Sequence, residues 1–385
     1  MTVDVLPRDL LVLTPGSFRV CLYRSGQLFV YDCLTRQRTR RGFMVSDGEI
    51  TAIHICPSKD TLFTLVEKSN ANASCSESVG SLLIYRKTEN EASVPIEDTT
   101  LKLIANNEFI CSVSECAIHV ISFSSFEVLK RQDTFSNPNA CGAISTEPNR
   151  TVICCLGLQR GTIRLERPGG DSDTMSSVIA AHESAVVAIA LSGNGNHVST
   201  ASEKGSLIRV HSTIDRCDLQ YEIRRSLILR NVGIASLFMN QLGSLVGCIN
   251  EGCESVSIFK SLMPHSPQAH LLDASDKASS SIGRNISWIF QKCQEAFSSR
   301  PYIEAKIPKG TNKIVAAQFG PEPDTLVIAS SSHGFLFRFN LDAKNSLVLQ
   351  HCGNIVEMEG ENTDNLPPPE DWIFLSHDDE PVNSL

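Results

Sequence analysis

The sequence predicts an all-β protein, in the form of one closed β-propeller with seven blades. Three observations lead to this prediction. Short apolar runs of strand length recur along the chain, and clusters of Gly, Asn, Ser and Asp separate them. The pattern repeats about every 40–50 residues, which is the period of a propeller blade. Because a propeller closes by repetition, one large domain replaces the two or three that 385 residues would otherwise suggest.

Each repeat contains an apolar strand, a turn, a second apolar strand, a short polar turn that often contains Gly, and a third strand. Residues 187–210, 232–259 and 313–339 follow this order most clearly. Four earlier segments fit the same order, namely residues 10–45, 49–86, 100–125 and 138–166. Long helical periodicity is nearly absent, so an Ig-like or two-domain β-sandwich is the structural alternative.

The composition is that of a soluble globular protein, with 42% apolar and 20% charged residues. The net charge of −9 gives no support to a general nucleic-acid binder, which would usually be basic. Residues 353–385 contain nine acids and no Lys or Arg, so the rest of the chain is neutral. We therefore expect the propeller to span residues 1–358 and residues 359–385 to form an acidic, disordered tail.

The sequence favours a cytoplasmic protein. The N-terminus lacks the long apolar core of a signal peptide, and no run approaches the roughly 18 apolar residues of a membrane-spanning helix. Most of the 14 cysteines lie inside apolar runs, as Cys154, Cys155 and Cys248 do. Reduced, buried cysteines are therefore expected, rather than a disulfide framework.

No enzymatic motif was found. The chain lacks a phosphate-binding loop and the His-Glu-x-x-His, Cys-x-x-Cys and Gly-x-Ser-x-Gly motifs. Cys111 and Cys116, like Cys248 and Cys253, have the wrong spacing for an ordinary zinc site. We therefore expect no catalytic activity, no cofactor and no metal.

The hairpin pattern stops in residues 261–300, which contain two prolines and a run of three serines. A long stretch of this kind inside a compact domain is usually functional or disordered. Within it, residues 286–297 have helical periodicity, with an apolar stripe on one face. That stripe suits shallow insertion at a lipid interface, packing on the propeller or docking of a protein. It consists of Ile286, Ile289, Phe290, Cys293 and Phe297, with Trp288 pointing elsewhere.

Arg224 and Arg225 form an adjacent pair at the end of the fifth repeat. Adjacent strand residues point to opposite faces, so the two guanidiniums can serve two different pockets. Each is a planar fork suited to phosphate oxygens. The preceding segment adds hydroxyl groups and a glycine whose backbone N–H groups can approach an anion, namely Thr200, Ser202, Gly205 and Ser206. The alternative is a pair of exposed arginines at a blade edge.

The run TASEKGSLIRV at residues 200–210, with AHESAV before it and IRR after it, closely resembles a known family. This is the PROPPIN or WIPI family of autophagy proteins, which are WD40-like β-propellers that bind polyphosphoinositides. The resemblance extends to VSIF at 256–259, FGPEP at 319–323 and GFLFRFN at 334–340. It covers roughly residues 10–358 and is most similar to the shorter-loop branch. His182 is similar to the His of the WD40 signature, although the terminal Trp-Asp is missing throughout.

The resemblance implies two head-group sites, one on each side of the arginine pair. Carried over by position, the first site consists of Thr200, Ser202, Gly205, Ser206, Arg209 and Arg224. The second consists of Arg225, Ser226, Ser255 and Ser257. The second site departs from the family pattern, because Ser226 replaces the usual Gly and Ser255-Val-Ser257 lacks the usual His. Glu251 stands where Ser is frequent, and it would repel phosphate if it faced the pocket.

The resemblance also implies a function. The protein would be a non-catalytic, monomeric adaptor that recognises phosphatidylinositol 3-phosphate, and the 3,5-bisphosphate as a further candidate, on a membrane. Its partners would include the large autophagy lipid-transfer protein, and it would be peripheral on phagophore, autophagosome-precursor or endosomal membranes. The membrane-inserting residues of loop 261–300 would be Ile286, Trp288, Ile289, Phe290 and Phe297. The alternative is a propeller that only scaffolds proteins.

Overall fold

The structure is a computed structural model of the 385-residue chain. The residues that it describes are 10–14, 19–24, 27–33, 35, 37–42, 49–55, 61–67, 80–86, 89–147, 149–168, 175–214, 217–225, 232–252, 255–261, 303–306, 314–320, 325–330, 335–341, 347–354 and 374–375. Ser226, the stripe at 286–297 and most of the acidic tail lie outside these residues.

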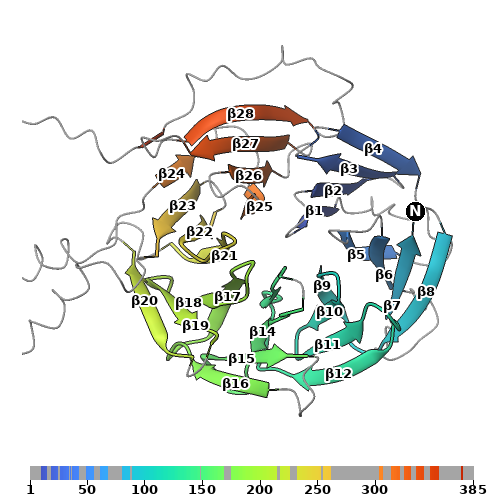
Figure 1. The fold of residues 1–385 in the computed structure, drawn as a ribbon, viewed down its shortest axis with the longest axis horizontal. Helices are drawn as coiled ribbons and strands as arrows, with labels where there is room; N and C mark the ends of the chain where they lie inside the picture. The colour runs from blue at the N-terminus through green and yellow to red at the C-terminus, as the bar shows by residue number, and fades with distance from the viewer. Residues whose placement is uncertain are drawn as a thin grey trace, which may run out of the picture.

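The described residues form seven antiparallel sheets arranged in a ring around a central axis (Figure 1). We number these sheets as blades one to seven in chain order. The strands of blades one to three are β1 (Leu10–Thr14), β2 (Arg19–Arg24), β3 (Gln27–Asp32), β4 (Gln37–Gly42), β5 (Glu49–Ile55), β6 (Thr61–Glu67), β7 (Gly80–Arg86), β8 (Glu89–Ile96), β9 (Thr100–Ala105), β10 (Phe109–Ser114), β11 (Ala117–Ser122) and β12 (Val128–Asp133).

The strands of blades four and five are β13 (Gly142–Ile144), β14 (Ile153–Leu156), β15 (Thr162–Arg167), β16 (Met175–Ala180), β17 (Val186–Leu191), β18 (His197–Ser202), β19 (Leu207–Ser212) and β20 (Leu219–Arg224). Blades six and seven contain β21 (Ile234–Met239), β22 (Leu245–Asn250), β23 (Ser255–Lys260), β24 (Ile303–Lys306), β25 (Ile314–Phe319), β26 (Thr325–Ser330), β27 (Phe335–Leu341) and β28 (Leu347–Asn354). A last strand, β29 (Phe374–Leu375), pairs with β24 and adds a fifth strand to blade six.

Apart from the added β29, every blade is a meander in which each strand pairs with the next strand of the chain. The first strand of a blade lies nearest the axis and the fourth lies at the rim (Figure 1). The first strands contact one another in order around the ring, and β25 of blade seven contacts β1 of blade one. This closure confirms the predicted seven-bladed propeller, and the β-sandwich alternative is wrong.

The core lies between neighbouring sheets. Between blades five and six, for example, Ala201, Ile208 and Ile223 pack with Val246 and Cys248 in one buried cluster. The opposite face of blade five packs its apolar residues on blade four. Each blade therefore has an apolar inner part on both faces, which requires the nearly continuous apolar runs seen in the sequence.

Each blade has a fourth strand, whereas the repeat predicted from the sequence contains only three. β12 and β20 are mostly exposed or half-buried, and their residues are largely polar. An outermost strand packs on only a small part of the neighbouring blades, so it needs little apolar alternation. Three of the four strands could therefore be predicted from the apolar pattern, whereas the fourth could not.

Cys154, Cys155 and Cys248 are buried, and each is a free thiol, as predicted. Burial raises the pKa of the Cys155 thiol to about 12, so it stays protonated and unreactive. Among the described residues, no helix has the length and hydrophobicity needed to span a bilayer.

Candidate functional site

The arginine pair lies at the rim of blade five, where β20 ends and the chain leaves for blade six. Arg224 is exposed and lies on the same face of the strand as Glu222. Arg225 is only 1% exposed, and its guanidinium contacts the linker that leads into blade six and the second strand of that blade. The strand alternation therefore separates the two side chains, as the sequence indicated.

On the first side, two arginines share one carboxylate. Arg209 and Glu222 are direct cross-strand partners between β19 and β20. The Arg209 Nε donates to Glu222 Oε2 at 3.0 Å, and the Arg224 Nη2 lies 2.9 Å from Glu222 Oε1. The Arg209 Nη1 also donates to the carbonyl of Ala181 at 2.7 Å, which ties blade five to the end of blade four.

The hydroxyl residues predicted for the first site differ in their exposure. Thr200 is completely buried, and its Oγ1 lies 3.0 Å from the Nε2 of His182. Ser202 is also buried, whereas Ser206 is half-buried in the turn before β19. His182, in the segment that leads into blade five, therefore contacts β18 of that blade through its imidazole. Burial lowers the pKa of His182 to about 4, so the imidazole is neutral at pH 7.

Gly205 lies beside the second arginine rather than the first. Its carbonyl accepts a hydrogen bond from Arg225 Nη1 at 2.7 Å. The backbone N–H of Arg225 in turn donates to the carbonyl of Ser206 at 3.0 Å. The turn that joins β18 to β19 therefore holds Arg225 in place, and the structure brings together Arg209 and Arg224 on one side and Gly205 and Arg225 on the other.

Arg225 is the centre of a buried network between blades five and six. Its Nη1 donates to the carbonyl of Val232 at 2.7 Å, and its Nη2 donates to Asn250 Oδ1 at 2.6 Å. Asn250 Nδ2 donates onward to Ser255 Oγ at 2.7 Å and lies 3.4 Å from Ser257 Oγ. The described second-site residues thus form one chain of hydrogen bonds.

One donor of this network is unused. Among the described residues, Arg225 Nε has no hydrogen-bond partner although it is buried. Burial also lowers the pKa of the guanidinium, because the charged form loses hydration. A buried charge without a counter-ion is costly, so an anion at this position would be stabilising.

Glu251 is exposed at the turn that follows β22. Its Oε2 accepts a hydrogen bond from the backbone N–H of Gly233 at 3.1 Å. The carboxylate is therefore held by the linker between blades five and six, close to the turn that contains Val232. Any anion that approached Arg225 past this turn would meet a negative charge.

Two residues of this region were missed by the sequence analysis, Glu222 and Asn250. Glu222 stands two residues before Arg224 on the same strand, so its position on the same face could have been predicted. Asn250 belongs to another blade, and only the register of the fold brings it to Arg225. No group of His, Cys, Asp and Glu among the described residues could hold a metal ion.

The arrangement as a whole offers two cationic groups at the rim of one blade. The guanidiniums of Arg209 and Arg224 lie next to each other, and the carboxylate of Glu222 lies between them. Each guanidinium has five N–H donors. A phosphate group could replace that carboxylate and bridge the two guanidiniums in the same way, with a different oxygen for each. The segment 262–302, which contains the apolar stripe, connects β23 to β24 in the neighbouring blade and lies outside the described residues.

Comparison with known protein families gives one clear match. The family model described as PROPPIN matches residues 85–352. Among curated proteins, WD repeat domain phosphoinositide-interacting protein 2 of Gallus gallus is 26% identical over 248 residues, or 60% of this chain and 55% of that protein. Autophagy-related protein 18 of Dictyostelium discoideum is 26% identical over 259 residues, or 63% of this chain and 66% of that protein. The matched region therefore spans about half to two thirds of these relatives.

Solved structures confirm the architecture. Kluyveromyces lactis Hsv2 with its complete loop 6CD has a TM-score of 0.65 at 16% identity, over 90% of this chain and 100% of that one. The complex of KlAtg21 with the coiled-coil of AgAtg16 gives a TM-score of 0.63 at 18% identity, over 91% and 99%. At these identities the likeness establishes the fold alone.

Proposed function

The chain belongs to the PROPPIN family, and from that premise we propose that it is a peripheral membrane adaptor that binds phosphoinositides and acts in autophagosome formation. Its relatives include phosphoinositide-interacting and autophagy-related proteins, and the family consists of non-enzymatic β-propeller adaptors. Its ligand is phosphatidylinositol 3-phosphate, with the 3,5-bisphosphate as a second candidate. The protein is cytoplasmic and binds phagophore, autophagosome-precursor or endosomal membranes.

The observation that carries this proposal is the pair of guanidiniums around Glu222. Arg224 is well exposed, with 62% of its side chain accessible, while Arg209 is anchored to Ala181. Arg224 is thus the more exposed arginine of the two, and Arg209 is the one tied to the neighbouring backbone. A phosphate that approaches this rim meets both guanidiniums after Glu222 is displaced, and charge-assisted hydrogen bonds are among the stronger polar contacts.

The two head-group sites would not be equivalent. The first would use Arg209 and Arg224, with Ser206 in the adjacent turn as a hydroxyl donor. The second would use the unused Nε of Arg225, with Ser255 and Ser257 behind Asn250. Since the exposed carboxylate of Glu251 lies at this second side, we expect the first site to supply most of the affinity.

A single head-group site binds weakly, so a second membrane contact would be needed for stable attachment. We assign that contact to loop 261–300 with the apolar residues of its stripe. The loop leaves blade six after β23, and the arginine pair lies at the junction of blades five and six. Head-group binding and insertion would therefore occur on neighbouring blades.

The partners of this adaptor would be autophagy proteins, including the lipid-transfer protein. KlAtg21, a structural neighbour, was solved in complex with the coiled-coil of AgAtg16, which supports a protein-recruiting role for this kind of propeller. We propose that the protein binds these partners as a monomer while one rim contacts the membrane.

Arg224→Thr tests the proposed function, because Arg224 is exposed and its replacement should leave the fold intact. Flotation with phosphatidylcholine vesicles that carry phosphatidylinositol 3-phosphate should show binding roughly tenfold weaker than that of the wild type. Vesicles with unphosphorylated phosphatidylinositol give the background. Arg150→Thr, which removes an exposed arginine of blade four, is the matched control and should bind normally.

The second candidate function is a scaffold for proteins only. The hydrogen bonds of Arg225 to Gly205, Val232 and Asn250 favour it, because they satisfy most of that guanidinium inside the protein. Equal flotation of wild type and Arg224→Thr, at the level of the background vesicles, would support the scaffold and contradict lipid recognition.

A further inference from the structure

A cavity of about 660 Å³ lies on the axis of the ring, away from the arginine pair. It is lined by the first strands of all seven blades and by turns that follow some of them. This volume is within the range of small-molecule sites, roughly 300–1,000 Å³. None of the residues proposed above to hold a head group lines it, so any ligand here would be independent of the lipid.

The lining of this cavity is mainly apolar. Its large apolar side chains include Ile189, Leu237 and Phe238. Its described residues include no Asp or Glu, and its titratable groups are Lys102 and His54. Burial lowers the pKa of His54 to about 4, so at pH 7 Lys102 carries the only full charge of the described lining.

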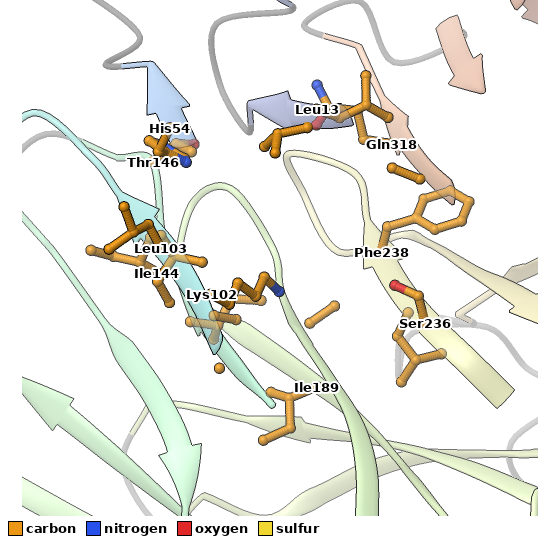
Figure 2. A pocket seen from close by; sticks show the side chains of 18 of the residues that line it. Leu13, His54, Lys102, Leu103, Ile144, Thr146, Ile189, Ser236, Phe238 and Gln318 are labelled. Atoms are coloured by element: carbon orange, nitrogen blue, oxygen red, sulfur yellow. The ribbon is translucent and has the colours of Figure 1, made fainter. Parts of the chain in front are cut away.

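Lys102 is on β9, in blade three, and its side chain extends into the cavity (Figure 2). Ile189 and Ser236 also line the cavity, from blades five and six (Figure 2). No hydrogen bond or ion pair joins Lys102 to another described residue, although its side chain is accessible from the cavity. The surrounding protein lowers the pKa of its ammonium by desolvation.

The Lys102 ammonium has no described counter-ion, and it attracts an anion more strongly in this partly apolar cavity than in bulk water. One positive charge matches one negative charge, so a monoanion is favoured over a polyphosphate. The aliphatic and aromatic lining would contribute by removing the body of the ligand from water. The polar groups of Ser236 and Gln318 could accept or donate further hydrogen bonds.

We propose that this axial cavity binds a small monocarboxylate with an aliphatic body. The carboxylate pairs with the ammonium of Lys102, and the aliphatic chain lies against Ile189, Leu237 and Phe238. The site is distinct from the head-group sites in position and in chemistry, because those sites present guanidiniums at the rim and this one presents a single ammonium on the axis.

Titration calorimetry of the full chain with sodium octanoate tests the proposal, with the neutral alcohol 1-octanol as the matched ligand. We expect octanoate to bind at a stoichiometry of one, and 1-octanol to bind roughly tenfold or more weakly. Lys102→Met should weaken octanoate binding by the same factor, whereas Lys102→Arg should retain it. Lys260→Met, at an exposed lysine outside the cavity, is the matched control and should bind as the wild type does.

Absence of octanoate binding to the wild type would overturn the proposal, and so would equal binding to wild type and Lys102→Met. A circular dichroism melt of Lys102→Met shows whether the variant is folded. If it is not, retained binding by Lys102→Arg together with protection of Lys102 from acetylation by octanoate supports the site, and lack of protection contradicts it. Flotation on phosphoinositide vesicles should be the same for wild type and Lys102→Met, so failure here is distinguishable from failure of the proposed function.

Discussion

At the scale of single residues, two neighbouring arginines have different environments. Arg224 is exposed beside a carboxylate, and Arg225 is buried beside carbonyl groups. The alternation of side chains along a strand was enough to predict that they point apart. The partner of each arginine could not be predicted in this way, because Glu222 meets Arg209 through the register of two strands and Asn250 comes from the next blade.

The carboxylate of Glu222 occupies the position between Arg209 and Arg224 where we propose that phosphate binds. We therefore expect Glu222→Gln to bind vesicles with phosphatidylinositol 3-phosphate more tightly than the wild type does, by about threefold to tenfold. The physical reason is that the amide competes less well for the guanidiniums. Vesicle sedimentation at constant ionic strength measures the change, since such binding depends on salt.

Glu203→Gln is the control for this prediction. It removes the same charge from the same blade, at the turn between β18 and β19, where Glu203 pairs with Arg160 of blade four. It should change binding less than Glu222→Gln does. Weaker binding by Glu222→Gln would contradict the competition and would mean that the carboxylate holds the arginines in position.

At the scale of elements, the turns between strands connect one blade to the next. Gly161, in the turn between β14 and β15 of blade four, has a φ of +79°, and its carbonyl accepts a hydrogen bond from the backbone N–H of His182 at 2.9 Å. A Cβ at Gly161 would lie 1.9 Å from the carbonyl oxygen of His182. The turn therefore packs directly on the segment that leads into blade five.

Gly161→Ala should be strongly destabilising, because the left-handed φ and the backbone clash act together. Gly252→Ala is a matched comparison, since Gly252 has a φ of +93° and a Cβ there would meet nothing within 4 Å. We expect a loss of about 1 kcal/mol for Gly252→Ala and at least about 2 kcal/mol more for Gly161→Ala. Urea unfolding of both variants measures the difference, and equal losses would show that the blades do not depend on this contact.

Some strands of each blade could be predicted from the sequence, and others could not. The inner three strands of each blade have apolar runs that predict them, whereas β12 and β20 are exposed outer strands with polar sequences. The pairing of β29 with β24 could not be predicted either, because two residues carry no periodicity. Burial on both faces makes a strand recognisable, and the outer strands have little of it.

At the scale of the whole molecule, the ring closes by contact of β1 with β25, while each blade is built from consecutive strands. Repetition of the sequence units predicted this ring, because a repeat that cannot bury its own faces must pack on its neighbours. The axial cavity was not predicted. Its lining takes one strand from each blade, so Lys102 and Ser236 come together only once the ring is closed.

The last prediction concerns acid stability, which depends on histidines in different parts of the ring. Burial lowers the pKa of His54, His182 and His211 from the ordinary 6.5 to about 4 each. Between these values the unfolded chain binds protons that the folded chain does not, so stability falls as the pH falls from about 6.5 to 4. Within that window, each of these histidines lowers the free energy of unfolding by roughly 1 kcal/mol for every unit by which the pH falls. Above the window they have no effect on stability.

The urea midpoint should therefore be constant between pH 7 and 8 and should decrease steadily from pH 6.5 to 4.5. In His211→Leu, a buried position loses its titrating group. Burial also lowers the pKa of His119 and His197, so His211 is one of five described histidines that act in the same direction. The slope of stability against pH should therefore be smaller than in the wild type, but most of it should remain. A profile that is flat down to pH 4.5, or a slope that His211→Leu leaves unchanged, would mean that the imidazoles are protonated in the folded ring. In that case they would have to be hydrated or paired with acids, and the blades around them would be more open to water than their burial indicates.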